Sequence, residues 1–179
     1  MSRSNEPAHE PVRRLHAVSE AQIDALAGVL IDCVEGGASV GFMLPLARER
    51  ALEFWRRVAD DAAAGRRALL VAEDARGLCG TVQLVLEQPD NQPHRADLSK
   101  MLVHRRARCR GLGAALMCAA ETTARECGKT LLVLDTASAE AERLYAREGW
   151  QRVGAIPGFA LLPQGGLCDT TLFYRQLVA

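Results

Sequence analysis

Apolar residues recur at helical spacing in two early segments of the chain. Ser19 and Gln22 form a capping-box pattern, in which a hydroxyl accepts from free helix N–H groups and the residue three positions on reciprocates. The helix behind them is predicted to end at Gly36-Gly37, and a second helix to run from Pro45 to Gly65. The apolar positions on the inner face of the first helix are Ile23, Leu26, Ala27, Leu30 and Val34.

Shorter apolar runs predict strands. The runs 68–73 and 78–86 flank a turn at 75–77, and so short a connection requires an antiparallel pair. The run 130–136 is almost wholly apolar, as expected of a central strand covered on both faces. Further strands are predicted at 12–17, 96–103, 150–153 and 170–176, and further helices at 112–127 and 138–148. Because a helix joins the strands at 96–103 and 130–136, these two require a parallel crossover, and the sheet is predicted to be mixed.

Length and composition fit one globular domain. The chain has 179 residues, of which 49% are hydrophobic and 25% charged, and we assign residues 12–179 to a single domain. Residues 1–11 are polar, contain two prolines and lack the apolar stretch of a secretion signal, so they are predicted to form a flexible tail. No run approaches the ~18 apolar residues of a membrane span.

Charge and cysteine usage exclude further classes. Lys+Arg and Asp+Glu number 22 each, so the basic excess typical of a nucleic-acid-binding protein is missing. The six cysteines show no CxxC spacing, which favours reduced thiols in a cytoplasmic protein over a disulfide framework or a zinc site.

The most informative segment is the strand, loop and helix from Leu98 to Cys118. Glycines at Gly111 and Gly113 let the backbone approach a ligand, and the first helical turn behind them presents unpaired N–H groups that attract anions. The simpler alternative is a solvated basic loop with a glycine bend. Four arginines in this loop would add positive charge for phosphates: Arg105, Arg106, Arg108 and Arg110.

Two nucleotide-binding patterns do not fit this segment. A dinucleotide fingerprint needs a third small residue where Leu116 stands, and its first glycine should follow the strand at once, whereas Gly111 comes eight positions after Val103. No Gly-Lys-Ser/Thr follows the glycines, which excludes a P-loop.

The segment 103–113 instead resembles the acetyl-CoA signature of the GNAT family of N-acetyltransferases, whose core is Arg/Gln-x-x-Gly-x-Gly/Ala. The resemblance extends to Leu144-Tyr145 and Gly149-Trp150, the second recognisable patch of the family. Within the family, the segments 36–43, 134–136 and 153–158 resemble the tabtoxin-resistance acetyltransferase subgroup. The resemblance implies an α/β (α+β) fold with a mixed, mostly antiparallel sheet of about seven strands and four helices.

The resemblance also implies a binding mode for acetyl-CoA, with no metal. The backbone of the strand ending at Val103 pairs with the pantetheine arm, and one N–H near its end faces the thioester carbonyl as an oxyanion donor. The amides of the loop and helix start surround the pyrophosphate. Ser138 stands where many members have an asparagine that contacts pantetheine, or it caps the fourth helix. The expected cofactor-binding residues are Met101, Leu102, Val103, Arg108, Cys109, Arg110, Gly111, Leu112, Gly113, Ala114 and Ser138.

Direct transfer to an amine requires two proton movements. The amine must lose a proton before attack, and the departing CoA thiolate benefits from a donor, a role in which Tyr145 matches the family tyrosine. Without the motif, Tyr145 reads equally well as a packed residue on a helix face. Asp97 and Asp135 are both candidates for the base, or for binding the substrate ammonium. Asp97 could equally be a solvated edge-strand residue, and Asp135 a helix-capping acceptor.

Besides Ser138, two positions depart from the family pattern. Cys109 stands where glycine is usual and would be strained if the loop needs a positive φ there, and Arg105 stands where proline is common. We expect acetyl transfer to a primary amine of a small, amino-acid-like or antibiotic-like molecule, with the acceptor pocket formed by 36–43 and 159–162. The main alternative is an acyl-CoA-binding sensor of the same fold that does not turn the cofactor over. A homodimer rests on family analogy alone.

Overall fold

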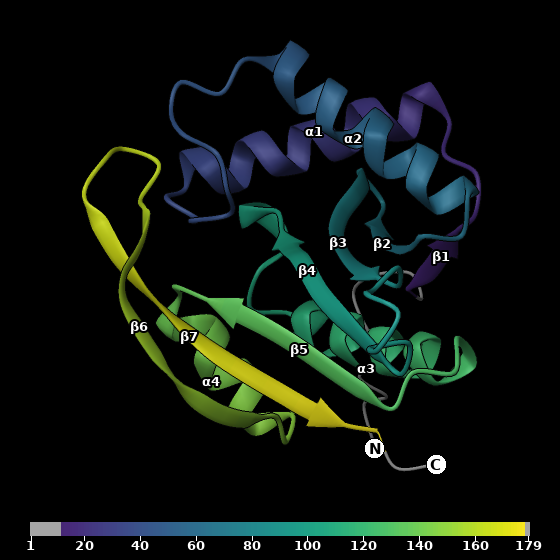
Figure 1. Cartoon of the computed structure of the whole chain (residues 1–179). Helices are drawn as coiled ribbons and strands as arrows, with labels where there is room; N and C mark the ends of the chain where they lie inside the picture. The colour runs from purple at the N-terminus through teal and green to yellow at the C-terminus, as the bar shows by residue number, and fades with distance from the viewer. Residues whose placement is uncertain (1–11, 178–179) are drawn as a thin grey trace, which may run out of the picture.

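The computed structural model describes residues 12–177 (Figure 1). The predicted tail, residues 1–11, lies outside them. The strands are β1 (Arg13–Leu15), β2 (Arg67–Asp74), β3 (Gly77–Val85), β4 (Arg95–Val103), β5 (Leu131–Thr136), β6 (Gln151–Leu161) and β7 (Leu167–Gln176). The helices are α1 (Glu20–Glu35), α2 (Arg48–Ala63), α3 (Leu112–Glu126) and α4 (Ala139–Arg147), with a 3₁₀ turn at Arg105–Ala107.

In this part of the chain the strands form one seven-stranded sheet in the order β1-β2-β3-β4-β5-β7-β6. Every neighbouring pair is antiparallel except β4 and β5, which are joined by the crossover through α3. The predicted fold, a mixed and mostly antiparallel sheet with four helices, is therefore confirmed.

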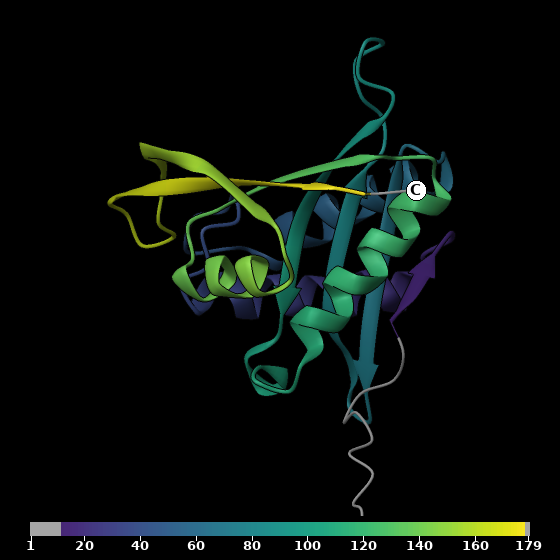
Figure 2. The ribbon, with the colours of Figure 1, turned by 90° about the horizontal axis from the view of Figure 1, so that it is seen from below.

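The helices cover the two faces of the sheet and define two apolar clusters. Helices α1 and α2 lie on one face of β2 to β4, and α3 lies on the other (Figures 1 and 2). Successive residues of β2 serve opposite faces: Leu69 packs in the cluster of Trp55, while Leu70 packs in the cluster of Leu116. Each such side chain contributes about 1.5–3 kcal/mol by leaving water, so both helical layers are held firmly to this half of the sheet.

Strands β4 and β5 separate after a short stretch of pairing. Only Arg95–Asp97 pairs with Leu131–Val133, although β4 continues to Val103. In β4 the register with β3 shifts, and Lys100 takes a positive φ of 49°. Such a bulge bends a strand and interrupts its pairing. The second half of β4 therefore has an edge with no strand beside it in the described residues.

Three details differ from the sequence prediction. The second helix begins at Arg48 and not at Pro45. The loop before it instead contacts the turn between β6 and β7, where Leu44 N donates to Pro163 O at 2.9 Å. Strand β6 continues past Val153 to Leu161, since an edge strand tolerates the missing N–H of Pro157. The apolar run of β5 is fully buried on one face only.

Candidate active site

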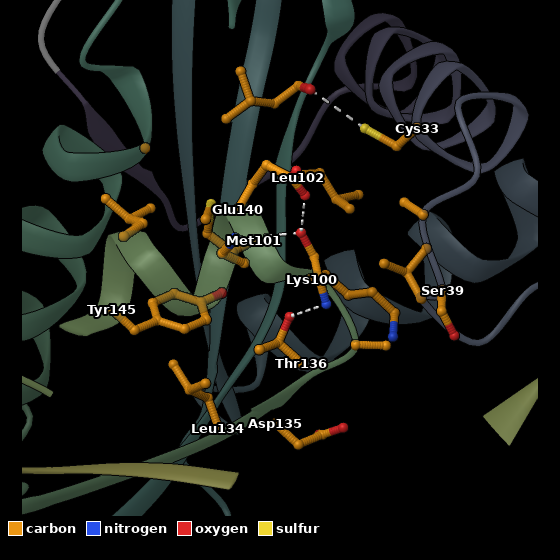
Figure 3. Close-up of a pocket in the computed structure, with 18 of the residues that line it drawn as sticks. Cys33, Ser39, Lys100, Met101, Leu102, Leu134, Asp135, Thr136, Glu140 and Tyr145 are labelled. Atoms are coloured by element: carbon orange, nitrogen blue, oxygen red, sulfur yellow. Dashed lines mark hydrogen bonds between the residues drawn. The ribbon is translucent and has the colours of Figure 1, made fainter. Parts of the chain in front are cut away.

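A cavity of about 1180 Å³ opens where β4 and β5 separate (Figure 3). Its walls come from the loop 36–41, the second half of β4, the start of α3, the end of β5, α4, and the end of the β6–β7 hairpin. Val133, on the less buried face of β5, is part of the wall, which explains why β5 is not covered on both faces. The volume exceeds the ~300–1,000 Å³ of an ordinary small-molecule site, so it suits two substrates side by side.

Helix α3 begins at the cavity with its N–H groups available. Gly111 is the N-cap residue, with a φ of 79°, no side chain caps the helix, and its first turn carries no acidic residue. The first backbone N–H groups of a helix have no partner within it, and the helix dipole makes this end positive. Of the residues expected around the pyrophosphate, Arg108, Cys109 and 111–114 line the cavity, whereas Arg110 does not.

Two of the four loop arginines serve the scaffold, which corrects the expectation that all four add charge for phosphates. Arg105 donates to Asp32 from its backbone N and from Nε, at 2.8 and 2.9 Å. Arg106 pairs with Asp74 and donates to the carbonyls of Gly77 and Leu78 at the start of β3, and its hydrogen bond lowers the pKa of Asp74 to about 2. These contacts fix the loop to α1 and to the start of β3, whereas Arg108 and Arg110 pair with no carboxylate among the described residues.

The loop geometry also explains its unusual residues. Cys109 has a φ of 60°, the left-handed conformation that glycine adopts without cost. The concern about strain at this position is therefore justified. At Gly113, a Cβ atom would stand 2.9 Å from Leu144 Cδ2, so this glycine allows α3 to pack closely on α4. The sequence analysis related Gly113 only to ligand approach and missed this packing role.

The expected pantetheine strand borders the cavity through all three of its predicted residues. Met101, Leu102 and Val103 line the cavity, and Leu102 is also buried against the α1–α2 layer. The carbonyl of Val103 accepts from Arg108 Nε at 3.1 Å and from the buried Cys33 thiol at 3.5 Å. Arg108 thus joins the end of β4 to the loop that follows it.

Tyr145 lies in α4 with its ring buried and its hydroxyl directed into the cavity (Figure 3). The residue is 4% exposed, and its ring packs against Trp150 and Phe173 with centroids 6.1 and 5.7 Å apart. Burial raises the pKa of Tyr145, and within residues 12–177 its hydroxyl has no hydrogen-bond partner. A hydroxyl that faces a cavity without a protein partner is available to a ligand. The packing interpretation of Tyr145 therefore holds for the ring, while its hydroxyl is available for the predicted catalytic role.

Ser138 lies at the start of α4 and lines the cavity. Its Oγ accepts from Ala141 N at 3.2 Å and donates to Glu140 Oε2 at 3.1 Å, so it caps the helix as one reading predicted. The cap does not exclude a ligand contact, because the residue also faces the cavity.

The two candidate carboxylates differ in how they are held. Asp97 pairs with Arg95 and accepts from Gln88 Nε2 at 3.2 Å, and β4 is an interior strand at this point, so Asp97 is not an edge-strand residue. Asp135 accepts from Thr170 Oγ1 at 2.7 Å and does not cap a helix, a role that Ser138 fills. Both line the cavity, and Asp135 is the one without an arginine partner.

The proposed acceptor segments, far apart in sequence, meet at the cavity. Ser39 Oγ donates to Leu161 O at 3.3 Å, and Cys168 Sγ donates to Ser39 Oγ at 3.6 Å. Residues 36–41 line the cavity opposite Phe159, Ala160 and Leu162. The sequence analysis missed Lys100, whose side chain also lines the acceptor part of the cavity. The available signal was a lysine within the predicted strand that leads into the glycine loop.

Comparisons with known proteins agree with this architecture. A family model described as "Acetyltransferase (GNAT) domain" matches residues 65–152. An uncharacterized N-acetyltransferase from the hisH-hisA intergenic region of Azospirillum brasilense is 32% identical over 126 residues, covering 69% of this chain and 73% of that protein. The chain belongs to the GNAT acetyltransferase family.

Solved structures share the fold over nearly the whole chain. The ribosomal-protein-alanine N-acetyltransferase of Brucella melitensis has a TM-score of 0.76 at 22% identity, with 94% of this chain and 100% of that chain covered. A GNAT superfamily phosphinothricin acetyltransferase of Sinorhizobium meliloti, in complex with acetyl-CoA, has a TM-score of 0.78 at 18% identity, with 95% and 89% covered. No helix within residues 12–177 has the length and apolar character needed to cross a bilayer, and the same residues contain no cluster of three or more His, Cys, Asp or Glu suited to a metal ion.

Proposed function

We propose that this protein transfers an acetyl group from acetyl-CoA to a primary amine of a small molecule, by direct attack in a ternary complex. The observation that carries the proposal is the cavity that connects the uncapped start of α3 with the loop 36–41 through the opening between β4 and β5. A cofactor entering from one side and an acceptor from the other would meet at Tyr145. We assign the activity to one domain, residues 12–179, and to the cytoplasm, on the composition and cysteine pattern of the sequence.

The cofactor would lie with its pyrophosphate on the amides of the loop and helix start, from Arg108 to Ala114. Unpaired N–H groups and the helix dipole favour an anion there. Arg110 and Arg108, whose Nε already donates to Val103 O, pair with no carboxylate among the described residues and can add positive charge. The pantetheine arm would run along the unpaired edge of β4, where backbone groups have no neighbouring strand. Acetyl-CoA in the Sinorhizobium meliloti structure supports this choice of cofactor.

In the chemical step the amine nitrogen bonds to the acetyl carbon and the carbon–sulfur bond breaks. An acceptor ammonium, with a pKa of roughly 10, gives up two protons, of which one leaves to solvent and one ends on the CoA thiol. The Tyr145 phenol, whose pKa is raised by burial, is protonated at neutral pH and holds the proton that it would donate toward the thiolate. Asp135 and Asp97 remain the two candidates for taking the first proton or binding the ammonium, with Asp135 favoured.

An amino-acid-like or toxin-like acceptor is favoured over a protein tail. The resemblance of segments 36–43 and 153–158 to tabtoxin-resistance acetyltransferases supports it, and so does the phosphinothricin acetyltransferase among the structures of the same fold. A homodimer stays a prediction by family analogy, which light scattering of the purified protein would test.

Calorimetric titration with acetyl-CoA, followed by thiol release over a panel of small amines, tests the proposed function. Micromolar binding with amine-dependent release would support the enzyme. Binding without release for any amine would favour the acyl-CoA sensor, and no binding would overturn the placement of the cofactor.

A further inference from the structure

Lys100 has a position that the proposed chemistry does not use. It lies at the bulge of β4 with a φ of 49°, and its half-buried side chain forms part of the cavity wall. Figure 3 shows this side chain extending from β4 toward Ser39 on the α1–α2 loop and away from Tyr145. The ammonium of Lys100 therefore lies on the acceptor side of the cavity, away from the cofactor side at the start of α3.

The surroundings of Lys100 do not neutralise its charge. Its Nζ stands 5.8 Å from the centroid of the Phe54 ring, and a Cβ built on Gly41 would be 3.8 Å from it. Within residues 12–177 no carboxylate pairs with it and no acceptor hydrogen-bonds to it. The charge of Asp135 raises the pKa of Lys100, but burial lowers it by more. A partly desolvated ammonium without a partner is unfavourable unless a ligand supplies the missing anion.

Lys100 and Asp135 present opposite charges to the same part of the cavity. They are too far apart to form an ion pair, yet near enough for the charge of Asp135 to act on Lys100. The loop 36–41 lines the cavity beside Lys100, and Gly41 carries no side chain that would cover the ammonium. The arrangement matches a molecule that carries a cation and an anion a few bonds apart.

We propose that Lys100 binds a carboxylate, or a similar anionic group, of the acceptor, whose amine is directed to Asp135. The acceptor is then an amino-acid-like zwitterion and not a simple cationic amine such as a polyamine. This inference rests on the proposed acetyl transfer. A simple cationic amine is disfavoured because Lys100 would repel it, whereas a zwitterion matches both charges.

The test compares L-α-amino acids with their α-carboxamides, which keep the amine and lose the negative charge. For acids that are turned over, kcat/KM from thiol release should exceed that of the amide by about 10²-fold. Lys100→Met should lower kcat/KM for the acid by about the same factor and change that for the amide less than about threefold. Lys100→Arg keeps the charge and should retain part of the preference for the acid.

Arg50→Met is the matched control. Arg50 is exposed and places its guanidinium 5.8 Å from the centroid of the Phe42 ring, which packs edge-on against Phe54. This variant removes a cation that lies beside the Phe42–Phe54 pair but outside the cavity. It should therefore leave the preference for acids over amides unchanged. Unchanged acetyl-CoA affinity in each variant shows that the fold is intact.

The outcomes separate this inference from the proposed function. Turnover of acids and amides at equal rates, or an equal loss for both in Lys100→Met, overturns the anion site and leaves the acetyltransferase. An acetyl group found on Lys100 itself by mass spectrometry also overturns it. If acetyl-CoA binds but no amine is acetylated, the proposed function fails. Calorimetry of the same acids with the CoA-saturated protein then decides: binding that Lys100→Met abolishes supports the anion site, and its absence overturns it.

Discussion

The two halves of the cavity are built from different parts of the chain. The cofactor half consists mainly of backbone: the start of α3, the loop before it and the free edge of β4. The acceptor half consists of side chains that reach in from a loop, a strand bulge and a hairpin, among them Lys100, Asp135 and Phe159. The first half offers amides in a fixed geometry, and the second offers individual charges and apolar surfaces.

This difference shows where selectivity resides. Backbone amides recognise an anion whatever the local side chains are, so the cofactor half can keep its ligand while surrounding residues change. Its geometry is held from behind by Arg105 on Asp32 and Arg106 on Asp74. In the acceptor half, Ser39 Oγ joins the loop 36–41 to Leu161 O of β6. The groups that face the acceptor there are individual side chains, and each is a separate determinant of which amine fits.

The largest expected effect is at Tyr145, where the two halves meet. Tyr145→Phe should lower kcat by about 10²–10⁴-fold, because the proton donor to the thiolate is lost. Acetyl-CoA affinity should be unchanged, and stability should change by less than about 0.5 kcal/mol, because the hydroxyl has no protein partner among the described residues. Calorimetry, thiol release and thermal unfolding check the three parts. An unchanged kcat in Tyr145→Phe would show that Tyr145 is not the proton donor to the CoA sulfur.

A comparison of the two carboxylates is expected to give the next largest effect. Asp135→Asn should lower kcat/KM by about 10²-fold, whereas Asp97→Asn should cost activity less than about tenfold, since Asp97 is already committed to Arg95 and Gln88. Both substitutions preserve shape and remove one charge, so each serves as the control for the other. The reverse order of losses in kcat/KM would assign the base to β4.

A smaller effect is expected from a charge placed in the cofactor half. Gly111→Glu should weaken acetyl-CoA binding about tenfold or more, because a carboxylate at the helix start competes with the pyrophosphate for the same N–H groups. Gly111→Ala is the control, since it introduces the same unfavourable φ of 79° without the charge. Equal dissociation constants for the two variants, measured by calorimetry, would mean that strain and not charge governs the site.

The same division governs how far the site could be predicted from sequence. Glycines before a helix and a strand before them are local patterns, so the element order and an anion site at the helix start follow from spacing, whereas the path of pantetheine along β4 was expected only from the family resemblance. Which arginines remain free could not be predicted, because Arg105 and Arg106 find their carboxylates 73 and 32 positions away in the chain. Lys100 was missed for a similar reason: its role depends on a bulge and on loops that tertiary packing brings together.

The smallest expected effect concerns the strained residue of the cofactor loop. Cys109 holds a φ of 60°, a conformation that costs a residue other than glycine about 1 kcal/mol or more. Cys109→Gly should therefore raise the midpoint of thermal unfolding by about 1–4 °C, with acetyl-CoA affinity equal or better. Cys118→Gly is the matched control, because Cys118 is exposed within α3, where glycine should cost about 1 kcal/mol. If both variants lower the midpoint of thermal unfolding, the Cys109 side chain stabilises the fold by more than its backbone strain costs.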